Sequence, residues 1–187
     1  MTDAASVGLL GGAFDPPHNG HVALSRGAHS QLGLARLVVL VVADPGHKQV
    51  HCPAGTRLAL ARAAFPGEDV ELDPHARTID MLRERRFDDP LFLIGADEFC
   101  DFPHWKEPDA VLDLARLGVA SRPGYDRARL EDVLGTLAHP ERVLFFEIEP
   151  VNASSSEVRD RVARGEPIDD LVPSAVAAEI ARRGLYR

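Results

Sequence analysis

The chain has 187 residues, of which 45% are apolar and 27% are charged, and its formal net charge is −8. This composition predicts a globular protein with a sizeable core, and we expect a single domain over residues 1–187. The negative charge argues against general binding to nucleic acid, because proteins that bind its phosphates carry a basic surface.

Targeting and redox features are sparse. The first residues lack the basic start and apolar core of a signal peptide, and no apolar run approaches the length of a membrane span. Cys52 and Cys100 are too few and too far apart to predict a disulfide framework or a metal site, so we expect two reduced thiols. These features predict a cytoplasmic protein with no membrane partner. They leave the oligomeric state open, a homo-oligomer included.

Strand-like apolar runs alternate with helical stretches along the chain. This alternation predicts a doubly wound, Rossmann-like α/β fold, in which a parallel sheet has helices on both faces. In chain order we expect strand 6–10, helix 20–32, strand 37–42, helices 56–65 and 78–86, strand 91–94, helix 109–115, strand 117–120, helix 127–138, strand 142–148, and helices 156–164 and 173–183.

The segment 11–21 reads Gly-Gly-Ala-Phe-Asp-Pro-Pro-His-Asn-Gly-His and lies between the first strand and the first helix. A glycine-rich turn lets a phosphate approach the backbone, and the helix N-terminus offers free N–H groups and a partial positive charge. His18 and His21 add hydrogen-bond donors at the same place. The segment therefore predicts a site for nucleotide phosphates.

Other unusual residues also follow expected strands. In doubly wound sheets, ligands bind beyond the carboxyl ends of the strands, where the strand order reverses. We therefore expect four further segments to lie on the same rim as 11–21, namely 44–48, 95–97, 121–124 and 154–156.

These segments resemble a known family. His18-Asn19-Gly20-His21 resembles the His-x-Gly-His signature of the nucleotidyltransferase superfamily. The whole segment 11–21 is similar to the Gly-Gly-Thr-Phe-Asp-Pro-x-His-x-Gly-His opening of bacterial nicotinate-nucleotide adenylyltransferases. The likeness continues, in the family's order, through Gly95-Ala96-Asp97, Trp105-Lys106, Ser121-Arg122-Pro123-Gly124, Ser154-Ser155-Ser156-Glu157-Val158-Arg159, Leu171-Val172-Pro173 and Leu185-Tyr186.

The resemblance implies a reaction in NAD biosynthesis. The family transfers the adenylyl group of ATP to nicotinic acid mononucleotide, giving deamido-NAD and pyrophosphate, with the assistance of Mg²⁺. The attacking phosphate has a second pKa of about 6, so it is mostly ionised at neutral pH and needs no general base. The enzyme instead has to hold two anions in line and stabilise charge on the leaving pyrophosphate.

The resemblance also implies roles for individual residues. His18, His21, Lys48 and Arg159 are the expected catalytic residues, all of them meeting phosphates. Phosphates and waters are expected to hold the Mg²⁺, so no protein metal ligand is assigned. On the ATP side we expect Gly11, Gly12, Ala13, Phe14, Gly95, Asp97, Arg122, Ser155 and Ser156, and on the mononucleotide side Thr78, Asp97 and Trp105.

The chain departs from the family's pattern on the acceptor side. Residues 42–48 form a shorter loop than the family's, and the family's Ser-Tyr-Thr segment appears as Ala76-Arg77-Thr78. Arg77 could pair with an acceptor anion or be a solvated arginine. These differences leave an alternative open, a related nucleotidyltransferase that uses another phosphorylated acceptor or CTP. A sensor that binds nucleotides without turnover is a third reading.

Simpler roles compete at several positions. The serine triplet could only cap a helix, and Asp97 could cap the helix that follows Gly95. Trp105 could be an ordinary half-buried aromatic, and Lys48 an ordinary loop lysine. Surface positions are expected for the remaining histidines other than His47, namely His29, His51, His75, His104 and His139.

Overall fold

The computed structural model describes residues 6–46 and 49–187. Contacts within the chain group its residues into two compact units. The first unit comprises residues up to Leu10, Leu24–Leu37 and Arg77–Pro150, and the second comprises Gly11–Ala23, Val38–Ala76 and Val151–Arg187. The single domain expected over residues 1–187 stays a prediction.

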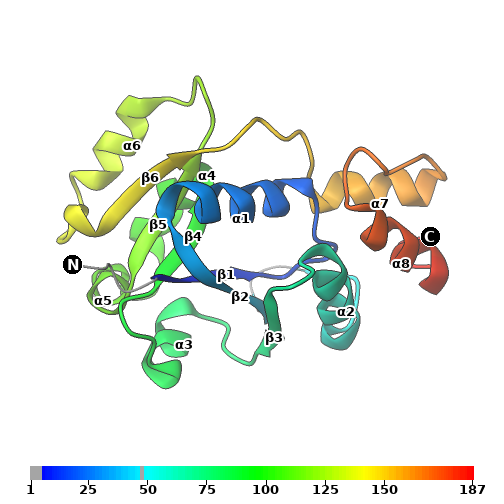
Figure 1. The fold of residues 1–187 in the computed structure, drawn as a ribbon, viewed down its shortest axis with the longest axis horizontal. Helices are drawn as coiled ribbons and strands as arrows, with labels where there is room; N and C mark the ends of the chain where they lie inside the picture. Colours follow the sequence, from blue (N-terminus) through cyan, green and yellow to red (C-terminus); the bar gives the residue numbers. More distant parts are fainter. Residues whose placement is uncertain (1–5, 47–48) are drawn as a thin grey trace. The chain divides into compact units, whose positions relative to one another are not determined.

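Strands and helices alternate through the described residues (Figure 1). The strands are β1 (Ser6–Gly12), β2 (Leu34–Val42), β3 (Asp69–Asp73), β4 (Leu91–Gly95), β5 (Arg116–Ser121) and β6 (Val143–Glu147). The helices are α1 (Asn19–Leu32), α2 (Ala54–Ala64), α3 (Thr78–Arg85), α4 (Ala96–Asp101), α5 (Pro108–Leu114), α6 (Arg127–Leu134), α7 (Ser155–Arg164) and α8 (Ser174–Arg183), with 3₁₀ turns η1 (Phe102–His104) and η2 (Pro140–Arg142).

The strands form a six-stranded sheet in the order β3-β2-β1-β4-β5-β6. The pairs β2–β3, β1–β4, β4–β5 and β5–β6 are parallel. The order reverses between β1 and β4, which is the arrangement of doubly wound sheets, and right-handed crossovers in the two directions place helices on opposite faces. The predicted fold class is confirmed.

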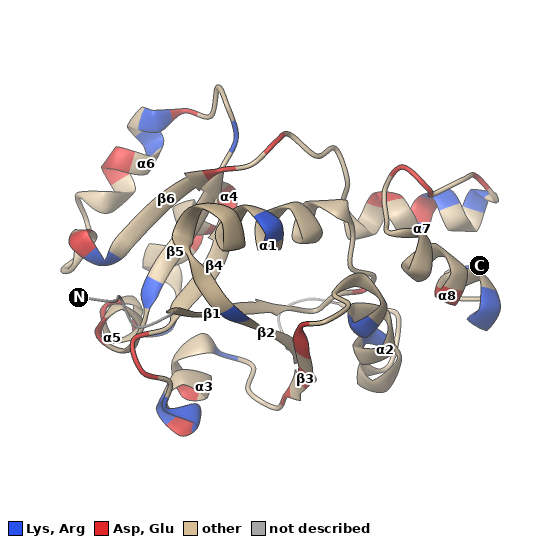
Figure 2. Ribbon diagram, viewed as in Figure 1, with Lys and Arg blue, Asp and Glu red and all other residues tan. Residues whose placement is uncertain are grey.

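The first unit has an apolar centre. Strands β1 and β4 carry no charged residue, and the charges of this unit lie mainly on its helices and loops (Figure 2). Gly118 on β5 allows close packing, because a Cβ there would fall 2.7 Å from a terminal methyl of Leu93 and 3.0 Å from one of Leu32. The last turn of α1 therefore lies directly against β5.

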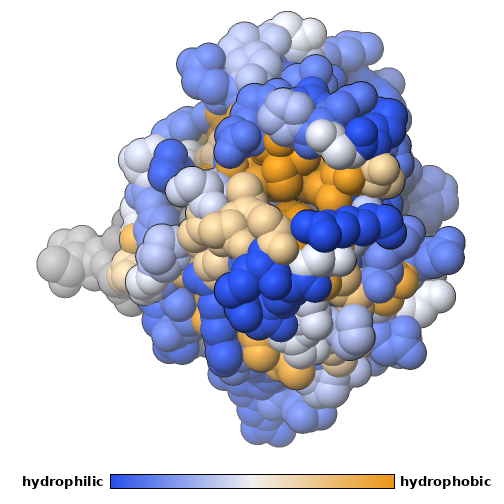
Figure 3. Space-filling model, turned by 90° about the vertical axis from the view of Figure 1, so that its right-hand side faces the viewer, coloured by the Kyte–Doolittle hydropathy of each residue, from blue (hydrophilic) through white to orange (hydrophobic). Residues whose placement is uncertain are grey.

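In the second unit, β2 pairs with β3 from Val38↔Asp69 to Val42↔Asp73, and α2 packs against α8. Helices α7 and α8 border a cavity of about 550 Å³ that is lined by apolar residues such as Val162 and Ile180 and by polar residues such as Glu166 and Arg187. Figure 3 looks onto this side of the second unit and shows apolar surface surrounded by hydrophilic residues. None of the helices in the described part of the chain is long and apolar enough to cross a membrane.

Three elements differ from the sequence expectation. No strand was expected over β3, because its sequence Asp-Val-Glu-Leu-Asp has no apolar run, as suits a strand at the edge of the sheet. A helix after Gly95 was expected as one that Asp97 could cap, but its bounds were not, since the six residues of α4 are too short for helical periodicity. The helix expected over 127–138 was too long, because it ends at Leu134 and is capped by the N–H of Gly135.

Candidate phosphate and nucleotide sites

His18 lies at the start of α1, in the second unit, and acts as its N-terminal cap. Its carbonyl accepts hydrogen bonds from the backbone N–H groups of His21 (3.0 Å) and Val22 (3.3 Å), as a residue preceding a helix does. Its ring Nδ1 accepts a third from the N–H of Gly20 (3.1 Å). The ring of His18 is therefore held at the positive end of the helix.

The two histidines of the motif share one protonation pattern. The Nδ1 atom of His21 accepts the backbone N–H of His18 at 3.2 Å, just as Nδ1 of His18 accepts that of Gly20. A nitrogen that accepts an N–H has no proton of its own, so the neutral rings carry their protons on Nε2. Burial lowers the pKa of His18 from 6.5 to about 4, so this ring is neutral at physiological pH. The rings lie 3.9 Å apart between centroids.

The glycines before this loop have a packing role. Phe14 has a φ of 49°, is 2% exposed, and packs against the rings of His21 (5.0 Å) and Phe65 (5.9 Å). A Cβ at Gly12 would come within 3.1 Å of the Phe14 ring. Gly12 is thus required to seat Phe14, which in turn supports His21. Because its ring is buried, the side chain of Phe14 belongs to the packing around the loop.

The β1–α1 loop (residues 13–18) is held by a buried arginine of α2. Arg57 is 1% exposed, and its guanidinium donates to the carbonyls of Ala13 (2.7 Å), Val42 (2.8 Å), Ala43 (2.7 Å) and Cys52 (3.0 Å). Burial lowers its pKa, but an arginine keeps its charge in proteins. Arg57 therefore connects the β1–α1 loop to the end of β2 and to the segment that precedes α2.

Helix α7 divides its three serines among different tasks. Ser154 caps the helix by accepting the N–H of Glu157 (3.1 Å), Ser155 Oγ donates to the Pro16 carbonyl (2.8 Å), and Ser156 Oγ accepts from Arg159 (3.3 Å). The other terminal nitrogen of Arg159 donates to the carbonyl of Asp15 at 2.7 Å. The structure thus brings Ser155, Ser156 and Arg159 to the loop that carries His18.

Asp15 is a buried carboxylate at the centre of this loop. It is 4% exposed, and the peptide bond that joins it to Pro16 is cis. Its Oδ1 accepts the hydroxyl of Tyr186 at 2.8 Å, and its Oδ2 accepts the backbone N–H of His51. Burial, together with the neighbouring Cys52 and Asp15, raises the pKa of Tyr186, so its hydroxyl stays protonated and donates.

In the first unit, Asp97 lies in the first turn of α4 and is exposed. It does not cap the helix, whose N-cap is Gly95 with no side-chain hydrogen bond. Its Oδ1 instead accepts the Tyr125 hydroxyl (2.9 Å), which also lies 3.6 Å from the thiol of Cys100. Burial and these two neighbours raise the pKa of Tyr125, so it too remains a donor.

Trp105 follows η1 and is half-buried. It packs edge-on against Phe92 (6.0 Å) and Phe102 (5.3 Å). The adjacent Lys106 pairs with Asp80 on α3 at 2.8 Å, which ties the tryptophan segment to the helix that begins at Thr78. The sequence-predicted residues Trp105 and Thr78 are thus placed on two connected elements.

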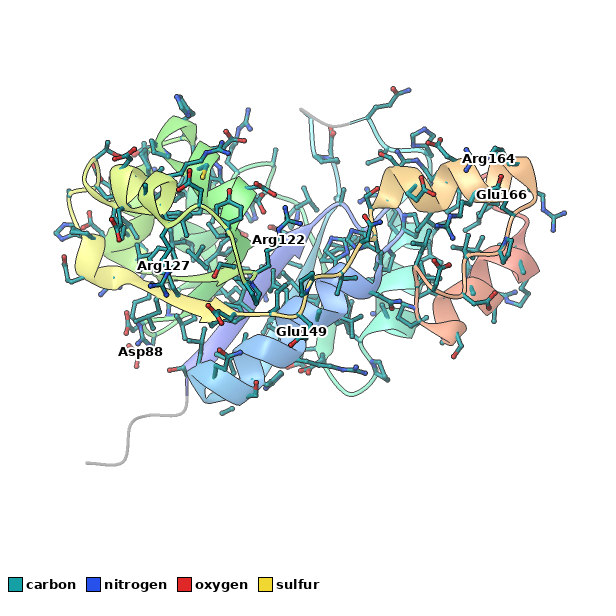
Figure 4. The ribbon with its side chains drawn as sticks, turned by 90° about the horizontal axis from the view of Figure 1, so that it is seen from above. Asp88, Arg122, Arg127, Glu149, Arg164 and Glu166 are labelled. Atoms are coloured by element: carbon teal, nitrogen blue, oxygen red, sulfur yellow. The ribbon has the colours of Figure 1, made fainter. Side chains whose placement is uncertain are left out.

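Arg122 is exposed and follows β5 directly, in a turn closed by the hydrogen bond from Tyr125 N–H to its carbonyl (3.0 Å). Figure 4 labels it together with Arg164, the last residue of α7, and Glu166, which form a surface ion pair (2.8 Å). A Cβ added at Gly95, the N-cap of α4, would have nothing within 4 Å of it, so packing does not require glycine there.

Two expectations need comment. Lys48, expected to meet phosphate, lies outside the described residues. His75 was expected at the surface, but it is part-buried and its Nδ1 lies 2.7 Å from the buried carboxylate of Asp73.

Both cysteines are free and buried. Where residues are described, no three His, Cys, Asp or Glu side chains gather in a way that could hold a metal ion.

Sequence reasoning assigned no role to Asp15, Arg57, Tyr125 or Tyr186. Asp15 and Tyr186 lie in segments that resemble the family's, so the sequence drew attention to both positions. It did not indicate that the two residues contact each other. Arg57 gave none, because it occurs in an Ala- and Arg-rich helix where solvated arginines are common.

The comparisons with known proteins identify the family of the chain. Residues 9–161 match the cytidylyltransferase-like family model. A protein of Roseiflexus sp. (strain RS-1), named probable nicotinate-nucleotide adenylyltransferase, is 35% identical over 98% of this chain and 99% of its own length. The chain belongs to the nicotinate-nucleotide adenylyltransferase family.

Other members and a solved structure extend this likeness. The equivalent protein of Rubrobacter xylanophilus is 35% identical over 97% of this chain and 92% of its own length. The nicotinic acid mononucleotide adenylyltransferase of Plasmodium falciparum, solved with NaAD, has the same fold, with a TM-score of 0.78 over 97% of both chains at 16% identity. As a member of the nicotinate-nucleotide adenylyltransferase family, the chain is a nucleotidyltransferase.

Proposed function

We propose that this nicotinate-nucleotide adenylyltransferase family member transfers the adenylyl group of ATP to nicotinic acid mononucleotide in the cytoplasm. The observation that carries the proposal is the pair of neutral imidazoles at the start of α1, both with Nδ1 turned to backbone N–H groups. Each ring then has an Nε2–H to donate to a phosphate oxygen without adding a fixed charge. The family membership supports the choice of substrates.

The reaction joins two anions and releases a third. A phosphate oxygen of the mononucleotide attacks the α-phosphorus of ATP, and the bond from that phosphorus to the oxygen bridging to the β-phosphate breaks. Pyrophosphate leaves with the electron pair, and deamido-NAD forms. No proton has to be removed from the attacking phosphate, so the protein's task is positioning and charge stabilisation.

The phosphate-side roles fall to residues of the second unit. We assign His18 and His21 to the transferred phosphate, and Arg159 and Lys48 to the charge on the leaving pyrophosphate. The guanidinium of Arg159 already donates to the Asp15 carbonyl, which fixes its position at the loop. Ser155 and Ser156 support the same phosphates, and the backbone of residues 11–14 lines them.

The nucleotide-side roles fall to residues of the first unit. Thr78, Asp97 and Trp105 are assigned to the mononucleotide, and Gly95, Asp97 and Arg122 to ATP. A half-buried indole presents a flat apolar surface on which a pyridine ring could stack. The carboxylate of Asp97, oriented by Tyr125, suits a ribose hydroxyl.

Magnesium belongs to this proposal as a substrate-bound ion. Apart from Asp15, the side chains gathered at the β1–α1 loop are imidazoles, guanidinium groups and hydroxyls, whereas Mg²⁺ prefers carboxylates, phosphate oxygens and water. The carboxylate of Asp15 is buried and already accepts hydrogen bonds from the Tyr186 hydroxyl and the His51 N–H. This donor set suits an ion held by the phosphates of ATP and by water, with no protein ligand. When bound there, Mg²⁺ would neutralise charge that develops on the pyrophosphate.

The test is an assay of pyrophosphate release and deamido-NAD formation from ATP, Mg²⁺ and nicotinic acid mononucleotide. Replacing His18 and His21 together by alanine should lower turnover by roughly 10²-fold or more. His139, an exposed histidine paired with Asp113 and Glu141, provides the matched alanine control. Turnover no better in the wild type than in the double variant would end the proposal. Parallel reactions with nicotinamide mononucleotide or with CTP in place of ATP test the substrates, and a clear preference for either would redirect it.

A further inference from the structure

The carboxylate of Asp15 poses a question that phosphate binding does not answer. A buried negative charge disfavours an anion nearby, yet Asp15 lies three residues before His18. The loop's cations do not contact this carboxylate, because Arg159 and Arg57 donate to backbone carbonyls instead. Among the described residues, the carboxylate contacts Tyr186, His51 and the thiol of Cys52.

Three other hydrogen bonds hold the backbone of the loop. Arg57 holds the carbonyl of Ala13, Arg159 that of Asp15, and Ser155 that of Pro16, at 2.7, 2.7 and 2.8 Å. These contacts fix where the chain passes. The side chain of Asp15 adds a contact that does not involve the backbone of the loop. This contact restricts rotation of the peptide units that precede His18.

The backbone around Tyr186 holds this residue where its hydroxyl contacts Asp15. Helix α8 ends at Gly184 in a left-handed cap, and the N–H of Leu185 donates to the Ile180 carbonyl (3.1 Å). Tyr186 itself has a φ of 61°, a conformation that costs energy for a residue with a Cβ. The packing of α8 against α2 and the bond to Asp15 compensate for that cost.

We propose that Tyr186 is a positioning residue for adenylyl transfer, acting through Asp15 on the loop that carries His18 and His21. This inference rests on the proposed function for its kinetic readout. Loss of the hydroxyl leaves Oδ1 of the carboxylate without this donor while Oδ2 still accepts the N–H of His51. The loop is then held less firmly, and the two imidazoles lose the alignment that in-line transfer requires. Misplacement by a fraction of an ångström lowers turnover more than binding, because the alignment matters most in the transition state.

The first test is Tyr186→Phe, which removes one oxygen and keeps the ring. We expect kcat to fall by about tenfold or more, tenfold being near the lower limit for one hydrogen bond to a charged group, with the KM values for ATP and mononucleotide within about twofold. Arg187→Ala is the matched control, since it changes the exposed neighbouring residue and should leave both constants unchanged. A Tyr186→Phe enzyme with wild-type kcat overturns the inference.

The second test is the coupling of Tyr186 to Asp15. In an Asp15→Ala background, Tyr186→Phe should have no further effect on kcat, because the two residues act through one contact. Effects that multiply independently would show that Tyr186 acts by another route.

The third test needs no turnover. NMR titration of His18 should give a pKa near 4 in the wild type. In Tyr186→Phe it should move toward 6.5, as the ring becomes less buried in a loosened loop. An unchanged value would contradict the inference even if the wild type lacked activity, whereas absent wild-type turnover with a shifted value would count against the proposed function alone.

Discussion

The lowered pKa of His18 makes stability depend on pH in a defined window. Burial places the folded-state value at about 4, compared with 6.5 in the unfolded chain. Between these values the unfolded chain binds more protons than the folded one, so the free energy of unfolding falls as the pH is lowered from 6.5 toward 4. Above 6.5 the contribution of His18 is constant.

The size of the effect follows from the difference in pKa. A pH of about 5 lies about 1.5 below the pKa of the unfolded histidine, and each pH unit in this window removes about 1.36 kcal/mol, so the expected loss is about 2 kcal/mol. Protonation also abolishes the acceptor that Nδ1 offers to the N–H of Gly20, and both causes act in the same direction.

The assay is urea denaturation at about pH 7 and about pH 5, in the wild type and in His18→Gln, whose side chain does not titrate. The wild type should lose about 2 kcal/mol more than the variant on acidification. Other titrating groups contribute to both proteins and cancel in the difference. Equal losses in the two proteins, or a His18 midpoint at 6.5 or above, would refute the reasoning.

Two further variants probe the two units separately. In Gly20→Ala the new Cβ would fall 2.9 Å from the His18 ring, so turnover should drop by roughly tenfold or more while helix propensity keeps the protein stable. Gly55→Ala, in α2 with nothing within 4 Å, is the control, and equal kinetics in the two variants would contradict this reading. Tyr125→Phe should raise the KM for the mononucleotide by roughly three- to tenfold through loss of the hydrogen bond to Asp97, and steady-state kinetics with an unchanged KM would exclude that role.

The sequence predicted the parts of the fold that depend on local pattern. Continuous apolar runs identified β2 and β4, and the glycine–histidine segment identified the turn before α1. The acidic edge strand β3 carries no such pattern, because its stability comes from pairing with β2 and from one covered side.

The site was predictable only where a residue's chemistry is visible in its own neighbourhood. Residues 11–21 lead to the prediction of a phosphate site because the turn, the helix start and the histidines are adjacent in the sequence. The contacts of Arg57 with four carbonyls and of Tyr125 with Asp97 depend on how distant segments meet, which side-chain letters do not encode. The division of labour among Ser154, Ser155 and Ser156 likewise depends on the folded chain, because three identical residues face three different partners.

The tether between Asp15 and Tyr186 spans 171 positions, and the bonds from Arg159 and Ser155 to the same loop span 144 and 139. The β1–α1 loop is thus among the first parts of the chain to be synthesised, whereas Ser155, Arg159 and Tyr186, which contact it, are among the last. A nascent chain that ends before α7 has the glycines and both histidines of the motif but none of these three supports. The ability to catalyse the reaction is therefore acquired late, when residues far along the chain form hydrogen bonds with a loop that was synthesised early.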